Sequence, residues 1–472
     1  MDTDYDLIVI GSGPAGEKGA AQAAYFGKKV ALVEKDTDLG GAAANTGILA
    51  SKALREMALA KLDGKTAPII SNIADYLRQE NPLKKVEQKR ILLNLERHHV
   101  ELYRGLASFV DPHTISIHSQ EGKIQQIRGE VILIAVGSSP NRQSIFPADD
   151  ARFYDSNTVL NIQKLPKTLL IVGGGVIGCE YACMFAALNT SVILVTARSR
   201  ILDFLDSEVS LTLQKQMQFL GVAFRTKESV VETKGTKPIE IQLASGNLLH
   251  VDEVLIASGR RGNTQNLNLL KVGIAVNEMG LIQTSENYQT SVPHIYAAGD
   301  VIGMPGLAAT SMEQARVAMV HAFNLKYKTG LASILPYGIY TIPECSMAGE
   351  TEQNLKRKDL PYIVGKTTYN HNARGRIIGE ENGFLKLLFH GEDMKLLGVH
   401  IIGPHASELI HIGVMALQMG ATADIFIRTC FNYPTLSEMY KYAAYDALGK
   451  QALKESGQAY VERMKTSLKF TT

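Results

Sequence analysis

Hydrophobic residues in the first part of the chain come in short continuous runs rather than in alternation. Such runs occupy residues 7–10, 30–33, 131–136 and 169–172, and a glycine or a charged residue follows each of them. Continuous apolar runs of this length are typical of strands that are buried on both faces of a parallel sheet. Because helical segments lie between them, we predict an α/β fold.

The stretches between these runs have different patterns. Residues 52–103 are largely helical in character, with a break near residues 64–68, and include a charged stretch at 88–99. That stretch could be a partner surface or, as is usual for such a pattern, the solvated face of a helix. Residues 106–117 alternate between apolar and polar positions, which predicts strands.

From Pro336 onward the chain changes to alternating strands. Residues 384–389 and 396–402 are the clearest of these, and a helix is expected to begin at Ala406. Residues 450–472 are charged and amphipathic, and their pattern indicates no particular role. We therefore expect a separate α+β domain at the C-terminal end.

The first apolar run leads directly into a glycine-rich turn. A helical segment and a second strand follow, and that strand ends at the acid Glu34. The glycines permit a tight turn that lets backbone N–H groups reach a pyrophosphate, and the acid can hold a ribose hydroxyl. The predicted dinucleotide-binding residues here are Gly11, Ser12, Gly13, Pro14, Ala15, Gly16, Glu34 and Lys35.

A second glycine-rich turn of the same kind follows the run at 169–172. Its predicted nucleotide-binding residues are Gly173, Gly175, Val176, Ile177 and Gly178. The next strand ends in Thr196, where an acid would select NAD, and Arg198 and Arg200 lie just beyond it. Loss of the acid beside two arginines favours tolerance of a 2′-phosphate. The alternative is that both arginines belong to an ordinary charged surface.

Composition narrows the class of protein. The chain has 472 residues, 45% of them hydrophobic, and a net charge of +2, which gives no reason to expect nucleic acid. No apolar run is long enough to span a membrane, and a strand begins too early for a signal peptide. The four cysteines match neither a metal site nor a disulfide framework, so we expect a reduced, cytoplasmic protein without a metal.

Five separated motifs occur in the order found in the pyridine nucleotide-disulfide oxidoreductases, and the chain resembles that family. The motifs are the first glycine turn, Gly40-Gly41 with Ser51-Lys52, the second glycine turn, Gly299-Asp300, and Pro434-Thr435 with Glu438. Within the family, segments such as residues 175–182 and 431–435 are most similar to the soluble pyridine nucleotide transhydrogenases.

Three positions depart from the family's pattern in a coordinated way. Ala43 and Ile48 stand where the family has its two redox cysteines, and Tyr433 stands where dithiol members have a histidine paired with the acid equivalent to Glu438. A thiolate is the nucleophile in dithiol exchange, so that reaction cannot occur at this place. The transhydrogenases tend to keep a cysteine at position 43, which leaves the electron acceptor of this chain open.

The resemblance also implies roles for individual residues. Lys52 would lie beside the reactive nitrogen of the flavin and pair with Glu180, and Asp300 would bind the ribityl chain of FAD. Three of the implied residues have a plainer alternative. Lys52 could be a solvated lysine, Glu180 an exposed helix acid, and Tyr433 a packing residue at the dimer interface. The implied catalytic residues are Lys52, Glu180, Tyr433 and Glu438. The remaining implied cofactor-binding residues are Gly41, Ala107, Gly137, Gly259, Gly299, Leu307 and Ala308.

The predicted organisation has an interrupted first domain. Residues 1–150 and 266–335 would form an FAD-binding Rossmann domain, residues 151–265 an NAD(P)-binding one, and residues 336–472 an α+β domain that forms a homodimer. The implied activity is ping-pong hydride transfer from NADPH through FAD to NAD+, which needs no thiol. One alternative is an NAD(P)H:quinone or other acceptor reductase. A non-catalytic flavin scaffold is a weaker alternative, because both glycine turns are intact.

Overall fold

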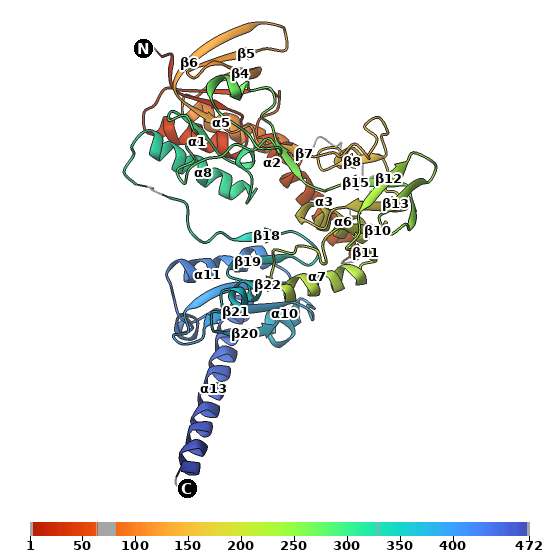
Figure 1. The fold of residues 1–472 in the computed structure, drawn as a ribbon, viewed down its shortest axis with the longest axis vertical. Coiled ribbons are helices and arrows are strands. Elements are labelled where there is room, and N and C mark those ends of the chain that lie inside the picture. Colours follow the sequence, from red (N-terminus) through yellow and green to blue (C-terminus); the bar gives the residue numbers. More distant parts are fainter. Residues whose placement is uncertain (1–2, 63, 65–81, 328–329, 470–472) are drawn as a thin grey trace. The chain divides into compact units, whose positions relative to one another are not determined.

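The computed structural model of the chain describes residues 3–62, 64, 82–327 and 330–469, and it confirms the α/β fold class (Figure 1). Contacts divide the chain into two compact units. The first unit comprises residues 1–173, 187–190 and 230–331, and the second comprises residues 174–186, 191–229 and 332–472. The predicted four-segment division into domains stays a prediction.

The first unit contains a sheet whose parallel part forms the expected Rossmann core. Its strands run in the order β3-β2-β1-β6, with β17 beside β6, and antiparallel β5 and β4 extend the sheet from β6. The strands are β1 (Tyr5–Ile10), β2 (Val30–Glu34), β3 (Glu101–Arg104), β4 (Leu106–Asp111), β5 (Thr114–His118), β6 (Ile124–Ile134) and β17 (Ile295–Ala297).

Helices α1 (Pro14–Tyr25), α5 (Pro82–Arg97) and α8 (Ala308–Ala322) pack with this sheet around one core cluster. In the parallel register, Ile10 pairs with Val33 on β2 and with Ile134 on β6. The three strands therefore end at the same edge, and the glycine turn begins there. This is where open α/β sheets bind their ligands.

The rest of the first unit consists of small strand groups. Parallel β9 (Thr168–Val172), β15 (Glu253–Ile256) and β8 (Phe153–Asp155) lie side by side, with β15 in the middle. The other members are the meander β12 (Val230–Lys234), β13 (Ile239–Leu243) and β14 (Leu248–Val251), and the pair β7 (Ser138–Pro140) and β16 (Arg260–Gly262).

The second unit has a nucleotide-binding half and a C-terminal half. The first consists of α6 (Val176–Ala187), β10 (Ser191–Thr196), α7 (Ser207–Phe219) and β11 (Val222–Thr226), with β10 and β11 parallel. The second is an antiparallel sheet in the order β18-β19-β22-β21-β20. Its strands are β18 (Tyr337–Ile339), β19 (Cys345–Gly349), β20 (Tyr362–Thr368), β21 (Phe384–His390) and β22 (Leu396–Ile402).

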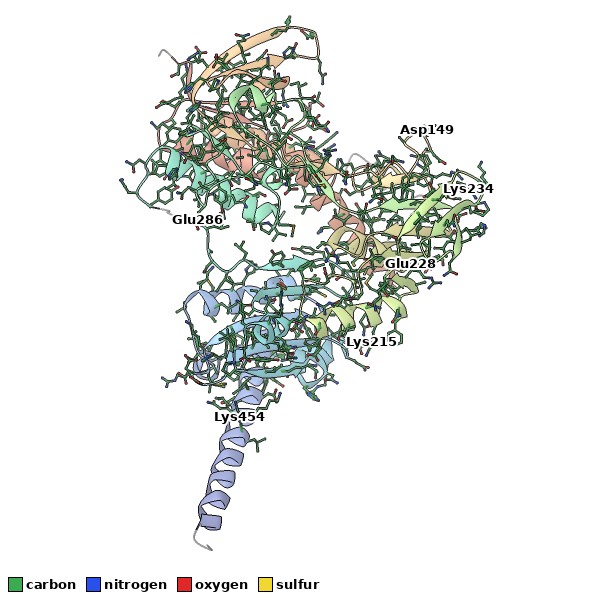
Figure 2. The ribbon with its side chains drawn as sticks, viewed as in Figure 1. Asp149, Lys215, Glu228, Lys234, Glu286 and Lys454 are labelled. Atoms are coloured by element: carbon green, nitrogen blue, oxygen red, sulfur yellow. The ribbon has the colours of Figure 1, made fainter. Side chains whose placement is uncertain are left out.

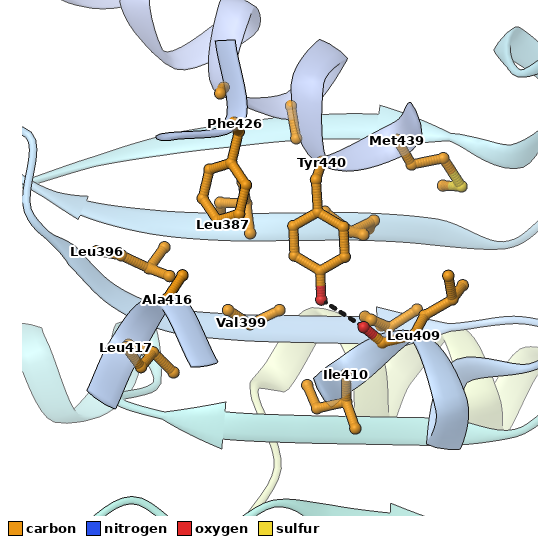
Figure 3. Packing of buried hydrophobic residues seen from close by; sticks show 14 of the residues in the cluster. Leu387, Leu396, Val399, Leu409, Ile410, Ala416, Leu417, Phe426, Met439 and Tyr440 are labelled. Atoms are coloured by element: carbon orange, nitrogen blue, oxygen red, sulfur yellow. Dashed lines mark hydrogen bonds between the residues drawn. The ribbon is translucent and has the colours of Figure 1, made fainter. Parts of the chain in front are cut away.

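Helices α11 (Ala406–Gln418), α12 (Asp424–Arg428) and α13 (Met439–Lys469) complete the C-terminal core (Figure 3). Its centre is Tyr440, which stacks on Phe426 and donates its hydroxyl to the carbonyl oxygen of Leu409 across 2.8 Å. A buried Tyr hydroxyl needs such a partner. The predicted strands 384–389 and 396–402 and the helix from Ala406 are all present.

The sequence pattern left three regions uncertain. The break expected near residues 64–68 lies outside the described residues apart from Gly64. The charged stretch at 450–472 begins inside α13, which continues as one helix to Lys469 (Figure 1). The helix α5 covers most of the charged stretch at 88–99.

A buried cation joins the two halves of the second unit. Lys386 on β21 is fully buried, and its ammonium donates to Asp206 across 2.9 Å, to Glu208 across 3.1 Å and to Glu352. Burial by itself lowers the pKa of Lys386, but the Glu352 hydrogen bond and the Asp206 charge raise that pKa above its ordinary value. Asp206 also caps α7 by accepting the N–H of Glu208.

Candidate active site

The first glycine turn needs its glycines for three different steric reasons. Gly11 has φ +103°, and a Cβ there would lie 2.5 Å from the carbonyl oxygen of Ala135. A Cβ at Gly16 would lie 1.8 Å from the carbonyl oxygen of Gly11, so α1 can approach the strand end only with glycine there. Gly13 has open space at its missing Cβ, which leaves the backbone accessible to a ligand.

The N-terminus of α1 is arranged to receive an anion. Gly13 is the N-cap residue, none of the described side chains caps the helix, and Pro14 occupies the first turn. A Cβ at Gly41, the first residue of α2 (Gly41–Asn45), would lie 3.1 Å from the Cα of Gly13. The first glycine turn and the Gly40-Gly41 motif are therefore neighbours, and uncapped N–H groups at a helix start bind phosphate.

Glu34 is held rigidly at the end of β2. The side chain is 6% exposed, and its Oε2 accepts from the Ser12 N–H at 2.8 Å and from the Ser12 hydroxyl at 2.6 Å. Its Oε1 accepts the N–H of Asp36 at 3.0 Å. A carboxylate fixed in this way suits a ribose hydroxyl. Lys35 is exposed, with its ammonium 3.8 Å from Asp36.

Gly299 and Asp300 lie where the chain returns to the Rossmann sheet. Gly299 has φ +84° and donates its N–H to Gln314 on α8 across 2.9 Å. Asp300 accepts from the Ser138 hydroxyl at 2.8 Å. Leu307 is the N-cap of α8 and Ala308 is its first residue, and within the described part of the chain no side chain caps this helix. Such a helix start stabilises negative charge.

Sequence reasoning missed two residues here, Arg260 and Ser138. Arg260 donates its Nε to the Ser138 hydroxyl across 2.8 Å and lies 3.8 Å from the Asp300 carboxylate. Burial lowers the pKa of Arg260, while the charge of Asp300 opposes the shift. The signal was present, because Arg260 directly follows Gly259 in the segment after β15. Gly137, with φ +66°, directly precedes Ser138.

The segment that carries the cysteines in dithiol relatives is a broken helix here. α2 ends at Asn45 and α3 (Ile48–Leu62) begins after a turn in which the N–H groups of Thr46 and Gly47 both reach the carbonyl of Ala42. Ala43 is partly exposed and Ile48 is 41% exposed. The segment therefore presents apolar side chains at both cysteine positions, and no thiolate can form there.

Lys52 and Glu180 belong to different units. Lys52 is on α3, with its ammonium 3.5 Å from the Ser51 hydroxyl. Glu180 is on α6, is 6% exposed, and accepts the N–H of Tyr340 across 2.9 Å. Glu180 is therefore a buried acid rather than an exposed helix acid. The pairing of Lys52 with Glu180 stays a prediction.

The second glycine turn repeats the steric pattern of the first. Gly173 has φ +124°, and a Cβ there would lie 2.3 Å from the carbonyl oxygen of Ala257. A Cβ at Gly174 would lie 3.0 Å from Thr196, and Gly175 has open space. Val176, Ile177 and Gly178 form the first turn of α6. Thr196 therefore lies beside the glycine turn.

The two arginines beyond Thr196 have different surroundings. Arg198 is 70% exposed at its side chain and forms an ion pair with Asp203. Arg200 donates its Nη2 to the carbonyl oxygens of Asp203 at 2.7 Å and Leu205 at 3.3 Å. The guanidinium of Arg200 thus holds the loop, whereas that of Arg198 faces solvent.

The remaining predicted residues lie on separate elements. Tyr433 is 74% exposed and Glu438 is partly buried in the short helix η5 (Leu436–Glu438). Ala107 is buried on β4, where it pairs with Ile117. Gly259 has φ +130° and open space around it.

Comparisons with known proteins agree with this geometry. The pyridine nucleotide-disulphide oxidoreductase model matches residues 5–322, and that family's dimerisation domain matches residues 335–444. The chain belongs to this family, as the resemblance predicted. It is therefore an FAD-dependent oxidoreductase that uses NAD(P)H, and its dimerisation domain indicates a homo-oligomer.

The chain is also similar to individual proteins. The soluble pyridine nucleotide transhydrogenase of Mycobacterium tuberculosis is 42% identical, over 95% of this chain and 98% of that one. The enzyme of that name from Sodalis glossinidius is 38% identical over the same shares. The HOCl-induced flavoprotein disulfide reductase RclA from Escherichia coli superimposes with a TM-score of 0.85 at 26% identity, covering 92% of this chain and 98% of RclA.

Proposed function

We propose that this protein is an NAD(P)+ transhydrogenase, which moves hydride between NADPH and NAD+ through a bound FAD. The observation that carries the proposal is the combination of two intact dinucleotide turns with a cysteine-free segment at Ala43 and Ile48. A cycle between two nicotinamide coenzymes needs a flavin and no thiol. Relatives of 38–42% identity bear the transhydrogenase name.

The residues of the first unit suit FAD. The uncapped start of α1 would hold the pyrophosphate, Glu34 a ribose, and Asp300 the ribityl chain, with the start of α8 facing the ring system. The open space at the missing Cβ of Gly13 would let the pyrophosphate approach the backbone, and the missing Cβ of Gly16 lets α1 pack against Gly11. When bound, the flavin supplies reversible hydride chemistry, and the protein supplies alignment and electrostatics.

The second glycine turn and Thr196 would bind the nicotinamide coenzymes in turn. Thr196 carries no charge that would repel a 2′-phosphate, and its hydroxyl can still bond a plain ribose. Lys52 and Glu180 would form a charged unit beside the flavin. The protein would act as a homodimer, and the relatives' printed description as soluble supports a cytoplasmic location.

Anaerobic mixing of the purified protein with NADPH tests the proposal. The yellow flavin should bleach without the long-wavelength band of a thiolate–flavin complex, and added NAD+ should restore the colour. Lipoamide and glutathione disulfide should not be reduced at enzyme-like rates. Colourless protein that FAD cannot reconstitute would refute the proposal, and robust lipoamide turnover would show that another cysteine had taken over.

The second candidate is an NAD(P)H:acceptor reductase. The observation in its favour is that the apolar side chains of Ala43 and Ile48 are both at least partly exposed, where they could contact a flat acceptor such as a quinone. In the same experiment, this candidate predicts that quinone or oxygen restores the colour and that NAD+ does not. A scaffold without turnover would not bleach at all.

A further inference from the structure

The loop after β10 is fixed to the glycine turn from several directions. The N–H of Leu202 donates to the carbonyl oxygen of Gly174 across 2.8 Å. Leu202 has a positive φ of 43° in this conformation, which is strained for a leucine. The N–H of Arg198 donates to the Thr196 hydroxyl across 3.3 Å. The loop therefore keeps Arg198 close to the residue that would face the ribose.

The two residues that follow β11 also hold this region through their backbone N–H groups. The N–H of Lys227 donates to the carbonyl oxygen of Arg198 across 2.9 Å. The N–H of Glu228, labelled in Figure 2, donates to the carbonyl oxygen of Thr196 across 3.0 Å. With Arg200 bonded to the carbonyls of Asp203 and Leu205, the backbone of the loop is held while the Arg198 side chain is exposed.

From this geometry we infer that Asp203 is a specificity-determining residue, which competes with the 2′-phosphate of NADP(H) for the guanidinium of Arg198. The Asp203 carboxylate is 38% exposed and forms an ion pair with Arg198. A phosphate monoester is the stronger partner for a guanidinium, because it carries more charge and more acceptor oxygens. NADP(H) therefore takes Arg198 from Asp203, and NAD(H) leaves the ion pair intact.

This inference rests on the proposed function, because it names how one pocket would serve both coenzymes. In a ping-pong cycle the two coenzymes bind the same pocket in turn, so neither should bind so tightly that it excludes the other. An unopposed Arg198 would favour NADP(H) strongly. The ion pair with Asp203 reduces that preference, because the arginine must give up one partner to gain the other.

Binding of nucleotide fragments tests the inference without flavin or hydride chemistry. Calorimetry on the full-length protein compares 2′,5′-ADP, which carries the 2′-phosphate, with 5′-AMP, which lacks it. Asp203→Asn keeps the side-chain shape but removes the ion pair that the phosphate must displace. It should therefore tighten 2′,5′-ADP binding by about two- to fivefold, which corresponds to the free energy of an exposed ion pair. Binding of 5′-AMP should not change, and the gain should shrink at high salt.

A double-mutant cycle shows whether Asp203 acts through Arg198. Arg198→Ala should weaken 2′,5′-ADP roughly tenfold, and adding Asp203→Asn to it should change nothing further. Asp424→Asn is the matched control, because Asp424 forms an exposed ion pair with Arg428 on α12 and its loss changes the net charge equally. That control should bind both fragments as the parent does.

Three results would overturn the inference. These are unchanged or weaker 2′,5′-ADP binding by Asp203→Asn, a gain that persists without Arg198, and an equal gain for 5′-AMP. The proposed function fails separately. If hydride does not pass from NADPH to NAD+ while Asp203→Asn still tightens 2′,5′-ADP through Arg198, the transhydrogenase proposal is wrong and the role of Asp203 stands.

Discussion

Glu180 on α6 accepts the main-chain N–H of Tyr340, which follows β18, across 2.9 Å. This hydrogen bond joins the nucleotide-binding half of the second unit to its C-terminal half. Glu180 is 6% exposed, so its carboxylate is oriented by the fold rather than by solvent. A buried acid with a fixed orientation on the helix of a nucleotide turn is a candidate for function as well as for packing.

We expect Glu180→Gln and Lys52→Met to slow flavin reduction by NADPH at least about tenfold. Removing one partner of a buried pair leaves the other charge uncompensated, which costs about 3–5 kcal/mol at full burial and less at the partly exposed Lys52. Stopped-flow absorbance measures the rate. Gln retains an oxygen for the Tyr340 N–H, so folding should survive. Parent rates in both variants would exclude a charged unit beside the flavin.

Arg200→Ala should lower kcat/KM for NADH and for NADPH to a similar extent, unlike Arg198→Ala. Its guanidinium bonds two loop carbonyls, and losing these bonds releases the loop that positions Thr196. A net hydrogen bond to a charged group contributes about 1.5–3 kcal/mol, and more than one such bond is lost. Separate kcat/KM values for the two coenzymes provide the measurement. A loss confined to NADPH would instead place Arg200 on the 2′-phosphate.

Lys386→Met should destabilise the protein by about 3–5 kcal/mol at pH 7, because it removes the cation that buried Asp206 binds, although Glu208 keeps its ion pair with Lys366. Despite burial, the charges of His400 and Lys386 keep the pKa of Asp206 below its ordinary 3.8, and hydrogen bonds from Lys366 and Lys386 keep the pKa of Glu208 below its ordinary 4.5. The contribution of these two carboxylates to stability is therefore fully present above pH 4.5, and it is lost as the pH falls through their folded pKa values. The difference in free energy of unfolding between the parent and Lys386→Met should therefore become smaller below pH 4. Denaturant titrations at several pH values measure this difference.

Glu253→Gln should stabilise the protein above pH 7. Burial, and then the charge of Asp252, raise the pKa of Glu253 to about 7, and among the described residues its buried Oε2 has no hydrogen-bond partner. A folded pKa above the unfolded value means that stability is complete below pH 4.5 and falls as pH rises through 7. With solvent screening, the gain at pH 8 should be about 1 kcal/mol.

The control for Glu253→Gln is Glu121→Gln, at an exposed acid paired with Lys123. That substitution should leave the pH dependence of the melting temperature unchanged. A Glu253→Gln variant that follows the parent at every pH from 4 to 8 would show that the Glu253 carboxyl is solvated and titrates normally.

The sequence by itself determined the elements that depend on local chemistry. Apolar runs at 7–10 and 169–172 became β1 and β9, because a strand buried on both faces needs apolar residues throughout. Gly11 and Gly173 were recognisable because a tight turn with positive φ and close backbone approach admits little else. The order of these motifs was sufficient to predict the family.

The tertiary structure alone decided what each polar side chain contacts. Arg198 and Arg200 look equivalent in the sequence, yet one bonds backbone carbonyls and the other a carboxylate. Lys386 lies in an apolar strand pattern, and its burial depends on acids from distant segments. Such contacts join residues far apart in the chain, so no local pattern encodes them, and their energies depend on burial that only the folded chain creates.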